Sequence, residues 1–575
     1  MGRNVVRQLT VAGFQVFAGP VTIPLGPLTL LYGPNSAGKS AILDAMLSLA
    51  DLCDLRAPMK RGADSNIHQV IGVIARHWRR QSTVPPTPAD KLHLGATVRI
   101  GGERWALAGF ASEHLLGLGP QKPQRSEFEE AYAVLRPLAK AVQLDVGVSI
   151  EYGLSDKGEL QLAPQVFGQE RRISVDLDGT PILRLLKSDG VAALNLDHPA
   201  LHAWNSAVVL KQLAQLPDHA FIRQDGWIGM HLSHVDDGWL YTNAVDAVER
   251  GVSRESVPQM RDAETSFIEM FNALFRASLR STCDTLRVPL VQASRVVPRR
   301  SEVTFLLAED ATPLSGESIG LQINGLPEHL EIVRSAFAAE LERSGTMQPV
   351  NRTGKRLSGV SKDPVELVNR LLSDYLFRDS GYFVAAGVHE LMTLRSPEGQ
   401  NAGATNKEGG RMYLVSLELR DSIGRRFYFD EVGSGLGYVL PVLLAIASSK
   451  TAFLQQPELH LHPALQSELA DALIAVLGDS YFGEDKSERC QQIIVETHSE
   501  HILLRLLRRV RQAAIPDRSL DPHSLGRESV VVLYVDPQPN GESTVKHLRI
   551  ARNGEFIDRW PRGFFEERWM ELFDE

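Results

Sequence analysis

Apolar residues in the first fifty positions come in short groups that glycine and proline separate. Each group is rich in residues typical of strands, so we predict four strands, at 5–11, 14–17, 21–25 and 27–32. After residue 40 the apolar positions recur with a helical period over 41–47. The pattern therefore predicts short strands that lead into a helix.

Alternation of apolar and polar residues continues from about 92 to 190 and predicts an antiparallel meander, with one helix inserted over 128–142. Two apolar groups, 96–100 and 105–110, flank a Gly-Gly pair and predict a hairpin. Residues 192–285 are predicted to be largely helical, most clearly over 260–279.

The last third of the chain has the sharpest pattern. It predicts strands over 413–419 and 427–429, an apolar helix over 439–446, and two buried strands that begin at Thr451 and Gln491 and end in polar residues. Strands that alternate with helices predict an α/β fold.

Composition narrows the class of protein. The chain has 575 residues, of which 43% are hydrophobic and 23% charged, enough for two or three globular domains. Its net charge of −9 provides no overall basic surface for nucleic acid, although a local basic face stays open. Three distant cysteines, a start without a signal-like apolar stretch and the lack of a membrane-length apolar run lead us to expect a cytoplasmic protein without membrane contact.

The strand at 27–32 ends in a glycine-rich turn, Gly33-Pro-Asn-Ser-Ala-Gly-Lys-Ser40, which matches the phosphate-loop template G-x-x-x-x-G-K-[ST]. Glycine lets backbone N–H groups curl around a phosphate, and the helix that follows offers its positive N-terminus to the anion. We expect Lys39 to reach the β- and γ-phosphates of ATP and the Ser40 hydroxyl to bind Mg²⁺. The other residues expected at the nucleotide are Gly33, Asn35, Ser36, Ala37, Gly38 and Ala41.

A second set of residues suits the same ligand. Gly433, Gly435 and Gly437 precede the apolar helix and offer another helix N-terminus to a phosphate. The two buried strands end in Gln455-Gln456 and in Glu496-Thr-His498. In phosphate-loop ATPases such strand ends carry the groups that face the metal, its water and the γ-phosphate.

These motifs follow one another in an order that resembles the ATP-binding-cassette heads of the RecF, SMC and OLD type. Residues 33–40 resemble the Walker A motif of that family, 432–441 its signature motif, 454–463 its Walker B motif and D-loop, and 496–499 its switch-histidine loop. Residues 553–565 are similar to the tail of a bacterial subgroup of these ATPases. Close matches cover about the first 50 residues and 410–575, with a looser match at 286–300.

The resemblance implies an α/β ATPase head formed by both ends of the chain, with a mixed β and helical insertion between them. It divides the chain into an N-terminal lobe with Walker A (1–90), a β-rich extension (91–190), a mainly helical insertion (191–409) and a C-terminal lobe (410–575). It also implies a homodimer in which two heads enclose two ATP molecules and each signature motif completes the site of the partner.

The chain departs from the family pattern where the Walker B strand ends. The family has two acids there, one for Mg²⁺ and one as general base, whereas this chain has Gln455 and Gln456. Glutamine cannot accept a proton from water, and general-base catalysis contributes roughly 10²–10⁴-fold. We therefore expect slow hydrolysis, with Gln455 and Ser40 at the metal and Glu458 or Glu496 as substitute acids. The expected catalytic residues are Lys39, Gln456, Glu496 and His498.

The resemblance extends to OLD-like ATPases and to those associated with Septu and retron systems. It implies an ATPase that acts in bacterial defence against phage, or in DNA maintenance, through a separately encoded effector such as a nuclease. The alternative is a non-hydrolysing scaffold that holds a partner protein or nucleic acid while ATP is bound. A transporter subunit is disfavoured, because roughly 400 residues separate Walker A from the signature motif and a compact ATPase domain needs about 250 or fewer.

Four other patterns suggest weaker hypotheses. A basic helix face at Arg505, Arg508 and Arg509 is either solvated or a contact to nucleic acid or a partner. Glu458, His460 and His462 are explained better by a turn after a strand than by a metal site. The order His498-Ser-Glu-His501 differs from the H-E-x-x-H of zinc proteases. Gln69 is a weak candidate for a metal-sensing glutamine.

Overall fold

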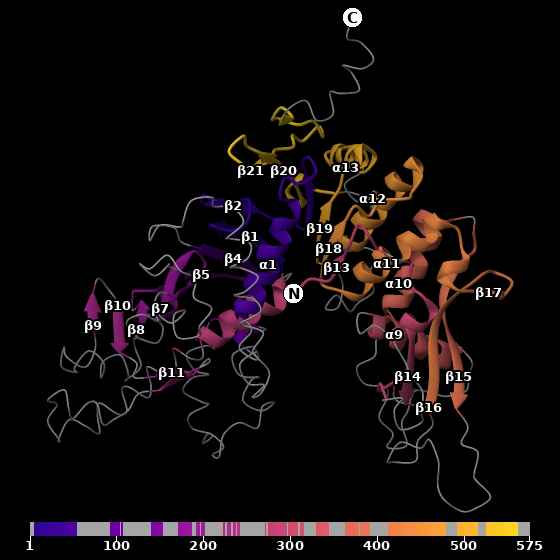
Figure 1. Cartoon of the computed structure of the whole chain (residues 1–575), viewed down its shortest axis with the longest axis horizontal. Helices are drawn as coiled ribbons and strands as arrows, with labels where there is room; N and C mark the ends of the chain where they lie inside the picture. Colours follow the sequence, from indigo (N-terminus) through magenta and orange to yellow (C-terminus); the bar gives the residue numbers. More distant parts are fainter. Residues whose placement is uncertain are drawn as a thin grey trace, which may run out of the picture. The chain divides into compact units, whose positions relative to one another are not determined.

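The structure is a computed structural model, drawn in Figure 1 with the element labels used below. It describes residues 5–53, 92–103, 105–106, 138, 140–152, 171–186, 191–195, 197–201, 222–224, 227–231, 234–236, 239–241, 271, 274–295, 297–308, 311–314, 329–343, 363–378, 380–391, 412–478, 491–515 and 525–561. The chain divides into two compact units. The first comprises Met1–Gly26, Tyr32–Val288 and Leu533–His547, and the second comprises Pro27–Leu31, Pro289–Val532 and Leu548–Glu575. None of the described helices has the length and apolar character needed to span a bilayer.

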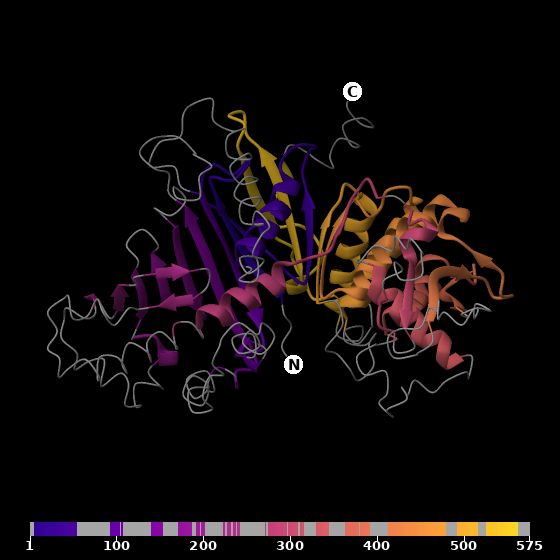
Figure 2. The ribbon, with the colours of Figure 1, turned by 60° about the horizontal axis from the view of Figure 1, so that its bottom comes forward.

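An antiparallel sheet dominates the described part of the first unit, with nine strands in the order β2-β1-β4-β5-β6-β7-β8-β10-β9. Its strands lie side by side in Figure 2, in indigo and magenta. The strands are β1 (Val5–Ala12), β2 (Val21–Pro24), β4 (Leu92–Ile100), β5 (Leu144–Tyr152), β6 (Arg171–Leu177), β7 (Thr180–Leu186), β8 (Val191–Asn195), β9 (Ile222–Gln224) and β10 (Trp227–His231). β11 (His234–Asp236) and β12 (Trp239–Tyr241) pair separately.

Alternating burial gives this sheet one apolar face. In β5 the side chains of Leu144, Val146, Val148 and Ile150 are buried, and the residues between them are only partly covered. The same period of two runs through β4 and β6, as expected for an antiparallel sheet with one face toward the core. Helix α1 (Lys39–Cys53) contacts β4 and buries the apolar positions that predicted a helix.

One sequence prediction for this unit is wrong. The hairpin of 96–100 with 105–110 does not form, because β4 pairs with β1 and β5. Trp105 is instead helical and fully buried, and its indole N–H donates to Ser278 Oγ at 3.4 Å.

The mainly helical segment expected after residue 191 contains β8 to β12 in its described part. Ala192 and Leu194 continue the buried alternation in β8, which pairs with the preceding strand β7. Residues 274–286 are helical, as the apolar period predicts. Gln69 and most of the helix predicted over 128–142 lie outside the described residues.

The second sheet has six strands in the described chain, in the order β13-β18-β19-β3-β20-β21, and the first four run parallel. β3 and β19 are buried along their whole length, as expected for central parallel strands. The strands predicted from Thr451 and Gln491 are therefore confirmed. The elements are β3 (Leu28–Tyr32), β13 (Leu290–Val291), β18 (Thr451–Gln455), β19 (Gln492–Glu496), β20 (Val530–Pro537) and β21 (Ser543–Leu548), with α11 (Ser434–Ser448), α12 (Pro463–Leu477), α13 (Glu500–Ala513) and the 3₁₀-helix η8 (Arg527–Ser529).

A smaller antiparallel sheet belongs to the second unit. Its central strand confirms the prediction over 413–419, whereas Phe429 begins a 3₁₀-helix instead of ending a strand. The strands are β14 (Thr304–Ala308), β15 (Phe383–Leu391), β16 (Met412–Arg420) and β17 (Arg426–Phe427), and the helices are α9 (Leu330–Arg343), α10 (Asp363–Leu371), the π-helix η5 (Leu372–Leu376) and the 3₁₀-helices η2 (Arg300–Val303) and η6 (Phe429–Glu431).

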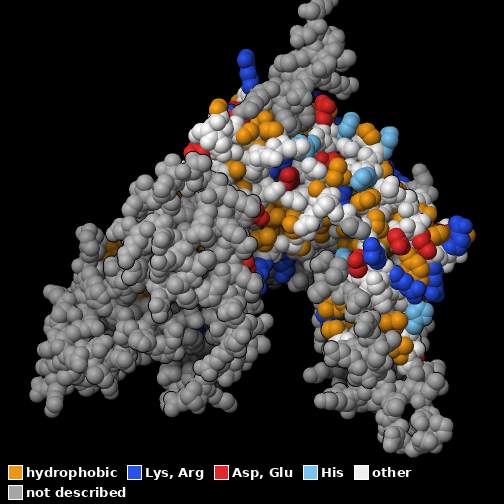
Figure 3. All heavy atoms as spheres, viewed as in Figure 1, with side chains coloured by type: hydrophobic (Ala, Val, Ile, Leu, Met, Phe, Trp, Pro, Cys, Tyr) orange, Lys and Arg blue, Asp and Glu red, His pale blue; other side chains and the backbone are white. Residues whose placement is uncertain are grey.

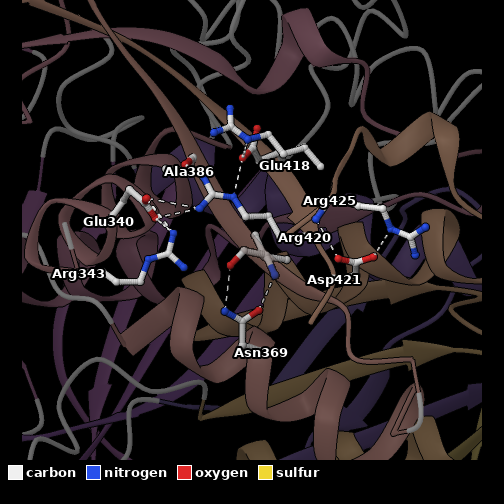
Figure 4. Close-up of polar contacts among 10 residues, drawn as sticks. Glu340, Arg343, Asn369, Ala386, Glu418, Arg420, Asp421 and Arg425 are labelled. Carbon is white, nitrogen blue, oxygen red and sulfur yellow. Dashed lines mark hydrogen bonds and ion pairs between the residues drawn. The ribbon is translucent and has the colours of Figure 1, made fainter. Parts of the chain in front are cut away.

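A buried arginine fixes this sheet to α9. Arg420 donates to Glu418 Oε1 and to the Ala386 carbonyl at 2.7 Å each, and its Nη1 lies 3.4 Å from Glu340 (Figure 4). At the turn between β16 and β17, basic and acidic side chains gather on the surface (Figure 3). The exposed Arg425 there donates to Asp421 Oδ2 at 2.6 Å. These charges serve the packing of the sheet.

Candidate functional site

The phosphate loop connects β3 to α1 and bends in a way that only glycine permits at two positions. Gly33 has φ +142° and Gly38 has φ +96°. A Cβ on Gly33 would lie 2.4 Å from the Val535 carbonyl oxygen, and one on Gly38 would lie 2.2 Å from Val16 Cγ2. The glycines of the motif are therefore required by backbone conformation and by close packing.

The loop rests on a residue near the other end of the sequence. The Ser543 hydroxyl, which is buried, donates to the Ala37 carbonyl at 2.7 Å. The Ser543 amide donates to the Val16 carbonyl at 2.8 Å. Ser543 is thus a supporting residue of the phosphate loop that sequence reasoning missed, since no local motif marks it.

Lys39 and Ser40 differ in exposure although they are neighbours. Lys39 is 4% exposed, and its ammonium group donates to the carbonyls of Gly33 and Pro34 at 2.9 Å each. Ser40, Asn35 and Ser36 are exposed, whereas Ala37 and Ala41 are buried and have only backbone groups to offer a ligand. A glycine cradle that holds a lysine and ends in an exposed serine at a helix start fits a Mg²⁺-bound nucleotide phosphate.

The carboxyl ends of β18, β19 and β3 lie at one edge of the parallel sheet. Gln455 is opposite Glu496, and Glu496 is opposite Leu31, two residues before the phosphate loop. The Gln455 amide donates to Glu496 Oε2 at 3.3 Å. The strand register thus brings Gln455, predicted at the metal, next to Glu496, predicted as a catalytic residue.

Gln456 begins a strained turn after β18. Its amide donates to the Glu496 carbonyl at 2.7 Å, and its φ of 43° lies in the left-handed region. His460 has φ 65° in the same turn. Such conformations are costly for residues with a side chain and persist where neighbouring contacts hold them.

Arg295 supplies those contacts. It lies after β13 and is 8% exposed. Its guanidinium donates to the carbonyls of Gln456 at 3.1 Å, Pro457 at 3.0 Å and Tyr438 at 2.8 Å, and Nη1 lies 3.4 Å from the Gln455 oxygen. Burial lowers the pKa of Arg295, and the charge of Glu458 acts in the opposite sense. The basic turn at 288–300 was visible in the sequence, but its target was not.

Glu458 is a buried acid in the same turn. Its Oε1 accepts a hydrogen bond from the backbone amide of His498 at 2.9 Å. Among the described residues no donor reaches its buried Oε2. Burial raises the pKa of Glu458, while the hydrogen bond from the His498 backbone amide opposes that shift. Glu458 therefore connects the Walker B turn to the switch-histidine loop.

The switch loop passes into α13 through Ser499. The Ser499 hydroxyl accepts from the Ile502 amide at 3.1 Å and so caps the helix. It also donates to Gln466 Oε1 on α12 at 2.7 Å. His498 is partly exposed and directly precedes Ser499, which these two hydrogen bonds hold in place.

The three glycines of the signature motif have different surroundings. Gly433 is the exposed N-cap of α11 and has open space around it. The amide of Gly437 donates to the Gly433 carbonyl within the helix, and a Cβ there would lie 2.9 Å from Val297 Cγ2. Gly437 thus serves close packing, and the start of α11 at Gly433 is the part that offers open amides. The helix begins five residues before the predicted 439.

Two histidines considered as metal ligands have other contacts in the structure. His460 stacks on Tyr438 with ring centroids 4.2 Å apart, and His462 caps α12 by accepting from the Ala464 amide. No group of three His, Cys, Asp or Glu that could bind a metal occurs in the described residues.

The basic face of α13 is largely committed to α12. Arg505 and Arg509 each donate to Asp471 at 2.7 Å, and Asp471 is buried. Arg508 is the exposed member of this face.

Comparison with known proteins matches one stretch of the chain to a family. Residues 342–504 match the family model described as "AAA domain, putative AbiEii toxin, Type IV TA system". This stretch includes α11, β18, α12 and β19 and therefore the strand ends described above. No curated protein matches the chain.

Solved structures similar to the chain include three SMC head domains. One is an SMC head bound to the C-winged helix domain of ScpA (10% identity, TM-score 0.36, 95% of this chain and 98% of that one). Another, from Pyrococcus furiosus, has an extended coiled coil and is bound to the C-terminal domain of ScpA (12%, 0.32, 99% and 99%). The third is the head domain from Thermotoga maritima (12%, 0.30, 95% and 100%). The chain is thus a mixed α/β protein with a phosphate loop between β3 and α1, and its residues 342–504 are similar to an AAA-type ATPase domain.

Proposed function

We propose that this chain is an ATP-binding ATPase of the ABC type that self-associates around ATP and controls a partner effector. The observation that carries the proposal is the phosphate loop. Gly33 and Gly38 have positive φ angles and no room for a Cβ, and Lys39 and Ser40 follow at the start of α1. The similarity of residues 342–504 to an AAA-type domain supports the same ligand.

The residues of the site have separate roles in this proposal. Lys39 and the loop amides bind the phosphates, and Ser40 with Gln455 holds Mg²⁺. The bound Mg²⁺ would neutralise charge on the β- and γ-phosphates. Glu496 is the acid at the strand ends, where it accepts from Gln455, and His498 faces the γ-phosphate. The exposed start of α11 at Gly433 contacts the nucleotide of a second copy.

Hydrolysis is slow in this proposal, because Gln456 cannot take a proton from the attacking water. A long-lived ATP-bound dimer would suit control of a separate effector, such as a nuclease, in bacterial defence against phage or in DNA maintenance. The alternative is a scaffold that binds ATP without hydrolysing it. The pairing of the Gln455 amide with Glu496 favours this second function, since that contact occupies part of the acid.

Equilibrium dialysis with ATP and analytical ultracentrifugation test the proposal. The Lys39→Ala variant should lose ATP affinity and ATP-dependent self-association, whereas the exposed Lys140→Ala should behave as wild type. The proposal is wrong if Lys39→Ala keeps both properties while its circular dichroism is unchanged. Phosphate release from wild type, measured with and without DNA, then separates a slow ATPase from a scaffold.

A further inference from the structure

The signature helix is attached to the Walker B turn at two points. The Arg295 guanidinium bridges the Tyr438 carbonyl on α11 and the carbonyls of Gln456 and Pro457. The Tyr438 ring stacks on His460 of the same turn, with an interplanar angle of 29°. A planar guanidinium presents several donors in a fixed arrangement, so it can join backbone oxygens from two elements at once.

Close packing reinforces the connection. Val297, two residues after Arg295, lies against Gly437, where a Cβ would come within 2.9 Å of its side chain. A displacement of the start of α11 would therefore press on the segment that carries Arg295. Buried, tightly packed elements transmit such displacements instead of absorbing them.

The Walker B turn is attached in turn to the switch loop. Glu458 accepts from the His498 amide, and its negative charge acts to raise the pKa of Arg295. Arg295 and Glu458 are both less than 10% exposed. In the second unit, the contacts of these two residues thus join α11, the turn after β18 and the loop after β19.

We propose that Arg295 and Glu458 are positioning residues that couple the signature helix to the Walker B turn and the switch loop. The proposal rests on the proposed ATP function. It adds a connection within one chain between the strand ends of β18 and β19 and helix α11. A nucleotide sensed at the strand ends changes the position of the signature helix, and hence its fit to the second copy. Ser543 supports the phosphate loop through Ala37 and Val16, outside the contacts of Arg295 and Glu458.

Four variants of the full chain test the coupling. Arg295→Lys keeps the positive charge but removes the planar guanidinium that donates to several carbonyls at once. Glu458→Ala removes the acceptor for the His498 amide. Arg508→Lys and Glu555→Gln, both at exposed positions of the second unit, are the matched controls. The measurements are hydrogen–deuterium exchange of residues 434–440, 455–461 and 497–500, ATP affinity, and ATP-dependent self-association.

We expect Arg295→Lys to raise exchange roughly tenfold in residues 434–440 and 455–461, as the loss of a charge-assisted hydrogen bond predicts. Glu458→Ala should raise it in 497–500. In both variants ATP-dependent self-association should weaken by at least about tenfold, and by more than the affinity for ATP does. The controls should match wild type in all three measurements.

The coupling is overturned if Arg295→Lys exchanges like wild type in both segments, or if self-association is unchanged while exchange rises. A variant that unfolds would raise exchange throughout the chain, and the nine-stranded sheet of the first unit is the internal reference for that. Failure of wild type to bind ATP would refute the proposed function instead, and the exchange measured without nucleotide would still decide whether Arg295 holds these segments.

Discussion

Gln455 and Glu496 lie opposite one another on neighbouring parallel strands, and the amide of Gln455 donates to the carboxylate of Glu496 at 3.3 Å. A carboxylate therefore lies at the carboxyl end of β19, opposite the glutamine that ends β18. Glu496 also lies opposite Leu31, just before the phosphate loop. This register keeps the carboxylate at the sheet edge, beside the turn that begins at Gln456.

Restoring the acid at position 456 should accelerate hydrolysis. Gln456→Glu keeps the size and the left-handed backbone of the residue but adds a proton acceptor. We expect ATP turnover to rise, by up to roughly 10²–10⁴-fold if position 456 faces the attacking water. Phosphate release under single-turnover conditions measures it, and adding Lys39→Ala should cancel the gain. No increase over wild type would place the base elsewhere.

Removing the acid from β19 should weaken the response to the metal. Glu496→Gln keeps a hydrogen-bonding partner for Gln455 but loses the charge. We expect half-maximal ATP binding to require a roughly tenfold higher Mg²⁺ concentration than in wild type. Mg²⁺ titrations of ATP binding measure this, with Glu500→Gln as the control. Identical titrations would show that Glu496 does not act on the metal.

Ser543 should matter for nucleotide affinity although no motif includes it. Ser543→Ala removes the hydroxyl that donates to the Ala37 carbonyl and leaves that buried oxygen without this donor. A lost neutral hydrogen bond is worth about 1 kcal/mol, which predicts roughly fivefold weaker ATP binding. The neighbouring exposed Thr544→Ala is the control. Equal affinity of the two variants would contradict the support assigned to Ser543.

Asp471 should be essential for joining α12 to α13. Asp471→Asn leaves Arg505 and Arg509 without their carboxylate, and their side chains are 25% and 15% exposed. We expect a loss of roughly 2–3 kcal/mol in unfolding free energy, below that of a fully buried pair because water reaches both arginines. Urea unfolding measures it. Arg508→Ala should change the unfolding free energy by less than about 0.5 kcal/mol. An equally small effect of Asp471→Asn would show that Asp471 does not hold α12 to α13.

Glu458 should make stability depend on pH in a direction opposite to most acids. Burial raises its pKa above the ordinary 4.5, so the folded state retains a proton that the unfolded state releases. The stability this provides is complete below about pH 4.5 and is lost as the pH rises through the folded pKa. Relative to wild type, Glu458→Gln should therefore gain stability as the pH rises above about 4.5. Urea unfolding at several pH values measures this, with Glu555→Gln as control. If the unfolding free energies of wild type and Glu458→Gln change with pH in the same way, the pKa of Glu458 is not raised.

The local parts of the site could be predicted because their information is local. The turn from Gly33 to Ser40 requires glycines at fixed positions, and β3, β18 and β19 are short apolar runs whose length and polar ends fix their place in a parallel sheet. The same periodicity failed at Trp105 and at 191–241. Trp105 is helical and buried against Ser278, and β8 to β12 pair with strands that are their neighbours in the sequence, so tertiary packing and sheet pairing outweighed the predicted tendencies.

Only the tertiary structure decided which groups meet. Ser543 supports a carbonyl at Ala37, 506 positions earlier, and Arg295 donates to oxygens more than 140 positions later. Backbone carbonyls are identical in every residue, so no sequence pattern marks the ones that an arginine or a serine will bind. The sequence by itself determined a phosphate loop and the strands around it. The folded chain determined what holds that loop and the turn after β18 in place, because buried polar groups take their partners from whatever the packing brings within reach.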